Sequence, residues 1–365
     1  MPEGAEGWPR ALQGDIAALK VLAGGGGGVV AWLAANKILG VVAYRAVDAK
    51  LPLPDSWQSH LRIEGAKRLL FDRALGEIGR SLGSEDVAWC PIKGMDLASR
   101  LYRWPEERQV GDIDVLVAAR DLGPARDALT AGGWRARCSD ERLRSFVREE
   151  GYNVQLVDAS EILLELHFRF WGMIGEGFAA EALSSAQPDP GLGSSGRRLA
   201  WPFAFVVAAV HCWTDPAPRA VRQWWEIQRL SEQGGEGMAS RVPEITRRWG
   251  LELPVAQAAA VVCELWPESS CGAIRDGLRS HLRMPERIVS SRAARRGPDL
   301  LGWHEIYLAR LLAGRLTRMG WRAPLRRLWD HPGTVAATTP ANWPWWRRRS
   351  MAVARNLGFF GGRQG

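Results

Sequence analysis

The sequence has few cysteines and very few lysines. Its 365 residues include five cysteines, with no CxxC pair and no spacing that suits a zinc site. These are Cys90, Cys138, Cys212, Cys263 and Cys271. An odd and sparse set in a long chain is typical of a reducing compartment, so we expect free thiols, most of them buried. Lysine supplies only five of the 48 basic residues. This preference for arginine indicates a GC-rich genome rather than selection for nucleic acid binding.

The sequence also lacks a secretory signal and a long apolar run. Its first ten residues, MPEGAEGWPR, carry two acids and no apolar core. The longest apolar stretches are Gly24 to Val47, which Asn36 and Lys37 interrupt, and Leu199 to Trp213, which is too short to span a bilayer. We therefore expect no transmembrane segment and a cytoplasmic location.

The composition is that of a folded protein with a substantial core. Hydrophobic residues make up 46% of the chain and charged residues 24%, with 19 tryptophans, which argues against wholesale disorder. The length suggests two or three structural units, at about 150 residues each. The formal net charge of +8 is uneven, because the segment from Ile306 onward has 11 arginines and one acid, Asp330. A polyanionic partner would therefore bind the C-terminal tail.

The pattern of hydrophobic residues divides the chain into helical and mixed parts. Over 11–82 they recur at steps of three to four residues, which predicts helices. From Val87, short strands alternate with short helices, which predicts a mixed sheet of about five strands. A stretch containing PDPGLGSSG follows and is the best candidate for a linker. We therefore expect an N-terminal helical region (1–84), a core (85–186), a linker (187–197), a helical domain (198–330) and a basic, partly disordered tail rich in tryptophan and arginine (331–365).

The individual elements follow from the same patterns. Strands are expected at 87–92, 110–118, 134–138, 152–157 and 162–170, and core helices at 95–102 and 124–131. After the linker, helices are expected at 201–233, 239–249, 254–265 and 303–318. The glycine run Gly24–Gly28 interrupts the N-terminal helical pattern. It lacks the GK[ST] ending of a phosphate loop, so we expect a linker or a helix break there.

Two aspartates stand two residues apart in a predicted strand, within the sequence RQVGDIDVLV at 108–117. Because side chains alternate along a strand, Asp112 and Asp114 face one side and Ile113 and Val115 face the other. Two carboxylates this close repel one another, whereas a divalent cation that bridges both makes the arrangement favourable. The pair therefore predicts a metal site, although by itself it would also suit a solvated strand end.

A third acid lies in the predicted strand EILLELHFRF at 161–170. Its alternate apolar residues bury one face and leave Glu165 and His167 on the opposite one. A carboxylate in mid-strand is costly unless it is paired or bound to metal. Glu165 is therefore a candidate third ligand that could also accept the proton of an attacking hydroxyl; the alternative is an ion pair with an arginine. His167 is a candidate supporting partner of the acids.

A lysine and a glycine, Lys93 and Gly94, stand where a predicted strand ends and a helix begins. Free backbone N–H groups and the helix dipole favour a phosphate at such a position. Gly94 lets the backbone approach the phosphate closely, and Lys93 adds a positive charge. The pair is informative through its place, one helix ahead of the two aspartates.

These motifs follow one another in a defined order along the chain. They are Lys93-Gly94, Leu101-Tyr102, Arg108, Asp112-Ile113-Asp114 and Glu165-Leu166-His167. The set resembles the nucleotidyltransferase superfamily that includes DNA polymerase β and kanamycin nucleotidyltransferase, and more closely its little-characterised bacterial branch. His211-Cys212-Trp213 and the segment from Arg222 to Ile227 are similar to later parts of that branch, with Glu226 where an Asp is expected. The resemblance covers roughly residues 30–235. It departs from the better-known members in having Lys-Gly for Gly-Ser and Glu for the third Asp.

The resemblance implies an α+β fold, with a polymerase-β-like core of about five strands and flanking helices, N-terminal helices and a C-terminal helical domain. It implies a metal-dependent enzyme that transfers a nucleoside monophosphate from a nucleoside triphosphate, with ATP favoured, and releases pyrophosphate. The acceptor could be a small molecule, a peptide natural product or a protein hydroxyl.

The resemblance also assigns roles to individual residues. Asp112, Asp114 and Glu165 would hold Mg²⁺ or Mn²⁺ and carry catalysis. Lys93, Gly94 and Arg108 would bind the phosphates, Arg108 through its planar fork of donors. For Arg108 the alternative is an ion pair with Glu106 or Glu107.

Three further residues, His167, His211 and Glu226, are candidates for the acceptor side of the cleft; alternatively, His211 and Glu226 satisfy one another in a helical core.

The arginines and tryptophans of the tail suit single-stranded nucleic acid, a membrane interface or an acidic partner, or else form a plain basic helix and a loose end. Nucleic acid is not favoured as a partner. Two other functions stay open: a non-catalytic module that binds RNA or a partner through this tail, and a glycosyltransferase that uses Asp112 and Asp114.

Overall fold

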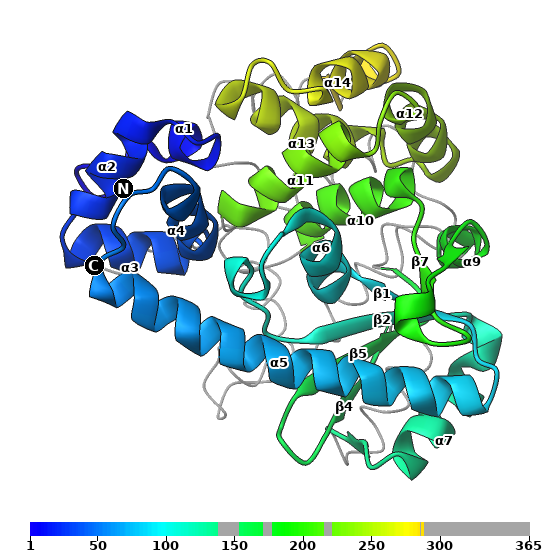
Figure 1. Cartoon of the computed structure of the whole chain (residues 1–365). Coiled ribbons are helices and arrows are strands. Elements are labelled where there is room, and N and C mark those ends of the chain that lie inside the picture. The colour runs from blue at the N-terminus through cyan, green and yellow to red at the C-terminus, as the bar shows by residue number, and fades with distance from the viewer. Residues whose placement is uncertain (138–152, 171–176, 215–220, 285, 288–365) are drawn as a thin grey trace, which may run out of the picture.

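The computed structural model describes residues 1–137, 153–170, 177–214, 221–284 and 286–287. It contains a five-stranded mixed sheet covered by helices on both faces, with further helices at each side (Figure 1). This is the expected α+β architecture.

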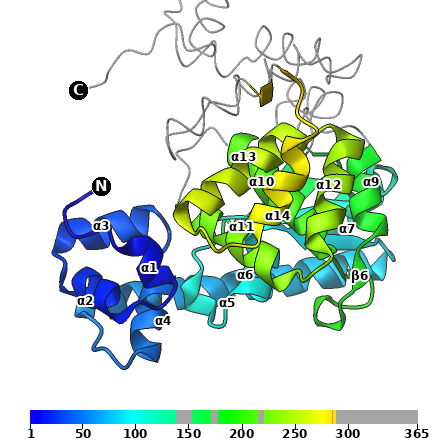
Figure 2. The same cartoon turned by 90° about the horizontal axis from the view of Figure 1, so that it is seen from above.

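The N-terminal region is helical, as the sequence predicts for 11–82. Its helices are α1 (Trp8–Leu12), α2 (Ile16–Gly24), α3 (Gly27–Ala35), α4 (Leu39–Asp48) and α5 (Asp55–Ser84). The glycine run Gly24–Gly28 is a helix break between α2 and α3, and Asp15 begins α2 by accepting a hydrogen bond from the Ala18 N–H at 3.0 Å. Helices α1 to α4 gather at one end of the long α5 (Figure 2).

The sheet follows directly in the chain. Its strands are β1 (Trp89–Ile92), β2 (Ile113–Val117), β3 (Arg135–Ala136), β4 (Asn153–Val157) and β5 (Leu163–His167), with helices α6 (Lys93–Leu101) after β1 and α7 (Leu122–Ala131) after β2. The spatial order is β1-β2-β5-β4-β3, in which β2 and β5 are parallel and the other pairs antiparallel. All five predicted strands are present, somewhat shorter than expected.

The two faces of the sheet differ in chemistry, as the alternation of residues predicts. Ile113, Val115 and Val117 of β2 are buried with Ile78 of α5 and Leu129 of α7. The opposite face carries the acids of β2 and β5. It also carries apolar residues that continue into the core beneath α6 and the C-terminal helices.

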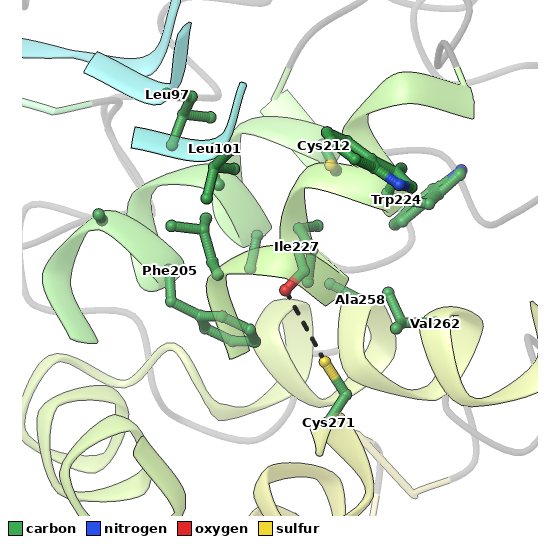
Figure 3. Packing of buried hydrophobic residues seen from close by; sticks show 14 of the residues in the cluster. Leu97, Leu101, Phe205, Cys212, Trp224, Ile227, Ala258, Val262 and Cys271 are labelled. Carbon is green, nitrogen blue, oxygen red and sulfur yellow. Dashed lines mark hydrogen bonds between the residues drawn. The ribbon is translucent and has the colours of Figure 1, made fainter. Parts of the chain in front are cut away.

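The C-terminal part is a cluster of helices. They are α9 (Gly177–Ser184), α10 (Trp201–Thr214), α11 (Val221–Gln233), α12 (Met238–Trp249), α13 (Glu252–Leu265) and α14 (Cys271–Arg279). Leu97 and Leu101 of α6 point toward Phe205 of α10 and Ile227 of α11, so this cluster docks directly on the helix that follows β1 (Figure 3). The N-terminal helices join the same core, where Trp8 meets the ring of Trp266 edge-on at 5.7 Å.

The C-terminal half differs from the predictions in its helices, and the segment expected as a linker has secondary structure of its own. The segment 187–197 is an ordered ribbon of β6 (Gln187–Pro188) and β7 (Arg197–Arg198), tied to the sheet by a hydrogen bond from the Trp89 N–H to the Ser195 carbonyl at 3.3 Å. The helix expected at 201–233 is two helices, α10 and α11. Helices α9 and α14 were not predicted. The helix expected at 303–318 and the tail 331–365 lie outside the described residues.

The cysteines of the described residues are buried thiols, as the sequence predicts. Cys90, Cys212, Cys263 and Cys271 are buried free thiols, and Cys138 lies outside the described part of the chain. Within that part, no single helix is both long and apolar enough to cross a membrane; only α2 and α3 together, bent by 114°, pass on length and composition.

Candidate functional site

Strands β2 and β5 bring two of the predicted acids together. Their parallel register places Asp114 directly beside Glu165. His167, two residues further along β5, lies with its Nε2 atom 2.8 Å from Asp114 Oδ1 and 3.4 Å from Glu165 Oε2. One ligand atom from each of these three residues lies within 4.8 Å of the others, so the group could hold a metal ion. Residues 53 positions apart in the sequence thus form one cluster, because adjacent parallel strands align their side chains.

Lys93 turns back onto this cluster from the start of α6. Its Nζ atom lies 2.7 Å from Asp114 Oδ1, and its side chain is 10% exposed. Its backbone has a φ of 49°, in the left-handed region that non-glycine residues rarely adopt. Such strain costs on the order of 1–3 kcal/mol and is typical of functional sites. Burial alone would raise the pKa of Asp114, but the Lys93 ammonium and the hydrogen bond with His167 hold it well below its usual range.

Asp112 precedes β2 and has a different environment. Burial and the negative charge of Asp114 raise its pKa to about 6, against the opposing effect of Lys93. No hydrogen bond or ion pair within the described residues reaches its carboxylate. An acid that is partly buried, repelled by its neighbour and left without a donor among the described residues is one that a cation would stabilise. Asp112 lies outside the group of Asp114, Glu165 and His167, whose ligand atoms come within 4.8 Å of one another, so its role as a metal ligand stays a prediction.

Glu165 is held in place from the other side of its strand. Gln155 of β4 stands opposite it in the register and donates from Nε2 to Glu165 Oε1 at 2.9 Å. Burial would raise the pKa of Glu165, yet the hydrogen bond with His167 and the positive charges nearby keep it lowered. The oxygens of Asp112, Asp114 and Glu165 are the donors that Mg²⁺ and Mn²⁺ prefer, and His167 adds one nitrogen. Asp114, Glu165 and His167 are placed to hold a divalent cation, and Asp112 is a predicted further ligand.

The residues predicted to bind phosphate, Lys93, Gly94 and Arg108, lie close to the backbone of Asp112. A Cβ atom on Gly94 would lie 3.6 Å from Arg108 Nη1 and 3.6 Å from the Asp112 carbonyl oxygen. The start of α6, the Arg108 guanidinium and the Asp112 backbone therefore converge on one point. This is where a phosphate could approach the backbone beside a positive charge.

The partner of Arg108 is not one that the sequence suggested. Its Nε donates to Glu226 Oε1 at 2.7 Å, rather than to Glu106 or Glu107, which are engaged elsewhere. Glu106 accepts a hydrogen bond from Tyr44, and Glu107 accepts two from the backbone at the start of its own short 3-10 helix. The Arg108 side chain is only 4% exposed.

Two of the three candidates for the acceptor side, Glu226 and His167, are buried. Glu226 of α11 is 3% exposed and accepts a further hydrogen bond from the Tyr102 hydroxyl at 2.7 Å. His167 is fully buried against Asp114, where a residue that supports the acids would stand. His211 lies partly buried on α10. The acceptor-side role of all three stays a prediction.

Two residues of this region were missed as site candidates. Arg222 stands four residues before Glu226 on α11, with its Nε 3.5 Å from Glu226 Oε1. Gln155 orients Glu165. The spacing of Arg222 and Glu226 on one helix face was a usable signal. No sequence signal pairs Gln155 with Glu165, since that contact follows from the strand register.

The chain matches a protein-family model for nucleotidyltransferases over residues 27–267, about two thirds of its length. The family is described as an uncharacterised nucleotidyltransferase, and the chain belongs to it. The match confirms the nucleotidyltransferase resemblance, while the bacterial branch stays a prediction. No curated protein matches the chain.

Proposed function

We propose that the protein is a metal-dependent enzyme that transfers a nucleoside monophosphate from a nucleoside triphosphate, ATP being favoured, to an acceptor hydroxyl. The observation that carries this proposal is the placement of Asp114 beside Glu165 on parallel strands, with Asp112 two residues away and repelled by its neighbours. Membership of a nucleotidyltransferase family supports the reaction type.

The charges of the site support binding of a triphosphate together with a metal. Four carboxylates, those of Asp112, Asp114, Glu165 and Glu226, lie near three cations, those of Lys93, Arg108 and Arg222. A divalent cation on the carboxylates would make the whole site positive, and a polyanion would then bind favourably beside it.

The reaction exchanges one phosphorus–oxygen bond for another. The acceptor hydroxyl oxygen attacks the α-phosphorus and forms a new P–O bond, while the bond to the oxygen that bridges to the β-phosphorus breaks. The bonding pair leaves on pyrophosphate, and Glu165 accepts the hydroxyl proton before it passes to water. Mg²⁺ or Mn²⁺ held by Asp112, Asp114 and Glu165 would neutralise phosphate oxygens and lower the pKa of the acceptor hydroxyl.

The residues of the chain supply binding and orientation. The backbone at Gly94 and the Lys93 ammonium are placed to contact the phosphates, and Lys93 can exchange Asp114 for a phosphate oxygen once a metal neutralises that acid. Gln155 and His167 fix Glu165 and Asp114 in orientation.

The test uses the full chain with each nucleoside triphosphate labelled at the α-phosphate, with Mg²⁺ or Mn²⁺. Transfer is scored to the protein itself, to RNA and to a metabolite extract, together with pyrophosphate release. We expect label to reach one of these acceptors in a metal-dependent manner. Absence of transfer and of pyrophosphate release with all four triphosphates would reject the proposal. Hydrolysis of a nucleotide sugar would instead favour a glycosyltransferase.

Gly94→Ala is expected to raise the KM for the triphosphate by about tenfold, the effect of losing roughly 1.4 kcal/mol of contact to the phosphates. The added methyl group has ordinary van der Waals room in the protein alone, so the melting temperature should change little. Gly123→Ala is the matched control, because Gly123 is also the second residue of a helix and has open space around its Cβ position. Equal KM values for the two variants would contradict phosphate contact at Gly94.

The affinity for Mg²⁺ is expected to fall below pH 6. Asp112 must lose its proton to bind a metal, and its pKa of about 6 means that protons compete with the metal below that value. The apparent affinity should decrease by about tenfold per pH unit there and stay constant above pH 7. Titrations with Mg²⁺ at pH 5, 6, 7 and 8 measure this. Asp112→Asn should remove the dependence; an unchanged profile in that variant would assign it to another group.

A further inference from the structure

A buried group of charges joins the sheet region to α11. Arg108 and Arg222 both face Glu226 Oε1, at 2.7 and 3.5 Å from their Nε atoms. Tyr102 donates its hydroxyl to the same oxygen, and burial raises its pKa well above 10, so it carries no charge. Two guanidinium groups therefore share one carboxylate.

The second guanidinium, that of Arg222, is incompletely satisfied. Its side chain is 11% exposed, and its Nε has no hydrogen-bond partner, although Nη1 donates to the Gln109 carbonyl at 2.7 Å. Burial and the charge of Arg108 lower the pKa of Arg222, which is the direction expected for a cation without enough negative charge around it. An anion bound beside Arg222 would offset the free-energy cost of burying its guanidinium group.

The group borders the predicted phosphate side. Arg108 Nη1 lies close to Gly94, at the start of α6, and the negative charge of Asp112 acts on both arginines. If Asp112 binds the metal, its negative charge is no longer available to neutralise Arg108 and Arg222. Arg222 shares Glu226 Oε1 with Arg108, so its positive charge lies next to the arginine that borders Gly94.

We propose that Arg222 and Arg108 together bind the β- and γ-phosphates of the triphosphate, and hold the pyrophosphate as it leaves. Arg108 comes from the loop before β2 and Arg222 from α11, so the phosphate site is assembled from the core and the C-terminal helices. Glu226 is the counter-charge of the pair and neutralises one of the two cations. This inference rests on the proposed nucleotidyl transfer and adds a residue, Arg222, to its substrate site.

The test is equilibrium binding of inorganic pyrophosphate with Mg²⁺ to the full chain, measured by calorimetry and without turnover. Arg222→Gln is expected to weaken pyrophosphate and ATP binding by about tenfold or more, the value of a charge-assisted hydrogen bond. AMP, which lacks the β- and γ-phosphates, should bind as tightly as it does to the wild type. Arg229→Gln is the matched control on the same helix, because Arg229 pairs with Glu232 at 2.8 Å.

The outcomes separate this inference from the proposed function. If the wild type transfers nucleotides and Arg222→Gln binds pyrophosphate normally, the inference is wrong and the proposed function stands. If the wild type binds no pyrophosphate, the inference is also wrong. Should Arg222→Gln fail to fold, as judged by its melting temperature, Arg222→Met decides: it removes the charge and keeps the apolar stem of the side chain, and an unchanged affinity for pyrophosphate in a folded Arg222→Met would likewise overturn the inference.

Discussion

Asp112→Asn is expected to slow metal-dependent pyrophosphate release by roughly 10³-fold, since it removes a metal ligand worth about 4 kcal/mol of transition-state stabilisation. The amide that replaces the carboxylate is nearly isosteric, so the change acts on charge and not on shape. Single-turnover assays at saturating Mg²⁺ and triphosphate measure the effect on the chemical step. A rate within threefold of the wild type would remove Asp112 from the site.

The same variant should keep or increase the stability of the metal-free protein. The pKa of Asp112 is about 6 in the folded chain, against an ordinary value of 3.8, so the free energy of unfolding falls as pH rises between these two values. At pH 7 to 8 the asparagine removes that cost. Asp127→Asn serves as the control, because Asp127 is exposed on α7 and pairs only with the neighbouring Arg126 among the described residues. A lower melting temperature for Asp112→Asn would contradict the repulsion between the two aspartates.

Glu226→Gln is expected to lower the free energy of unfolding by about 3–5 kcal/mol, the usual cost of removing one partner from a buried ion pair. Two guanidinium groups would remain buried without the carboxylate that they share. Urea denaturation at pH 7 measures the change. Glu232→Gln is the matched control on α11, because the ion pair of Glu232 with Arg229 is about one-third exposed, and exposed pairs contribute at most about 1 kcal/mol. Equal losses in the two variants would contradict a structural role for the buried pair.

Strand periodicity made much of the site predictable. The alternation in β2 and β5 assigned Ile113 and Leu164 to the face under α5 and Asp114 and Glu165 to the other, and the structure confirms both. This works because a buried face fixes the register, and a shift of one residue would reverse every side chain. The order of the motifs then led to the family that the match over 27–267 confirms.

Partners that meet only in three dimensions could not be predicted. Arg108 has two acids within its own loop, and the sequence offered them as its alternative partners, but Tyr44 and the backbone at the start of the 3-10 helix donate to those carboxylates. The acid that pairs with Arg108 stands 118 positions away on α11. The glycine-rich composition of 187–197 likewise predicted a linker, and no sequence signal indicated that the segment forms β6 and β7 and accepts a hydrogen bond from the Trp89 N–H of β1. Composition indicates only the local conformational preference of a segment, and tertiary contacts can override that preference.

The contact between Trp8 and Trp266 has a consequence for dissecting the protein. Both tryptophans belong to one apolar interior, which also includes Ile92 at the end of β1 and Leu97 of α6. A fragment limited to 85–186 would therefore expose a large apolar surface to water and would be prone to aggregate. Excision of the sheet alone is not a route to a smaller folded protein, because early and late segments of the polypeptide jointly complete its interior.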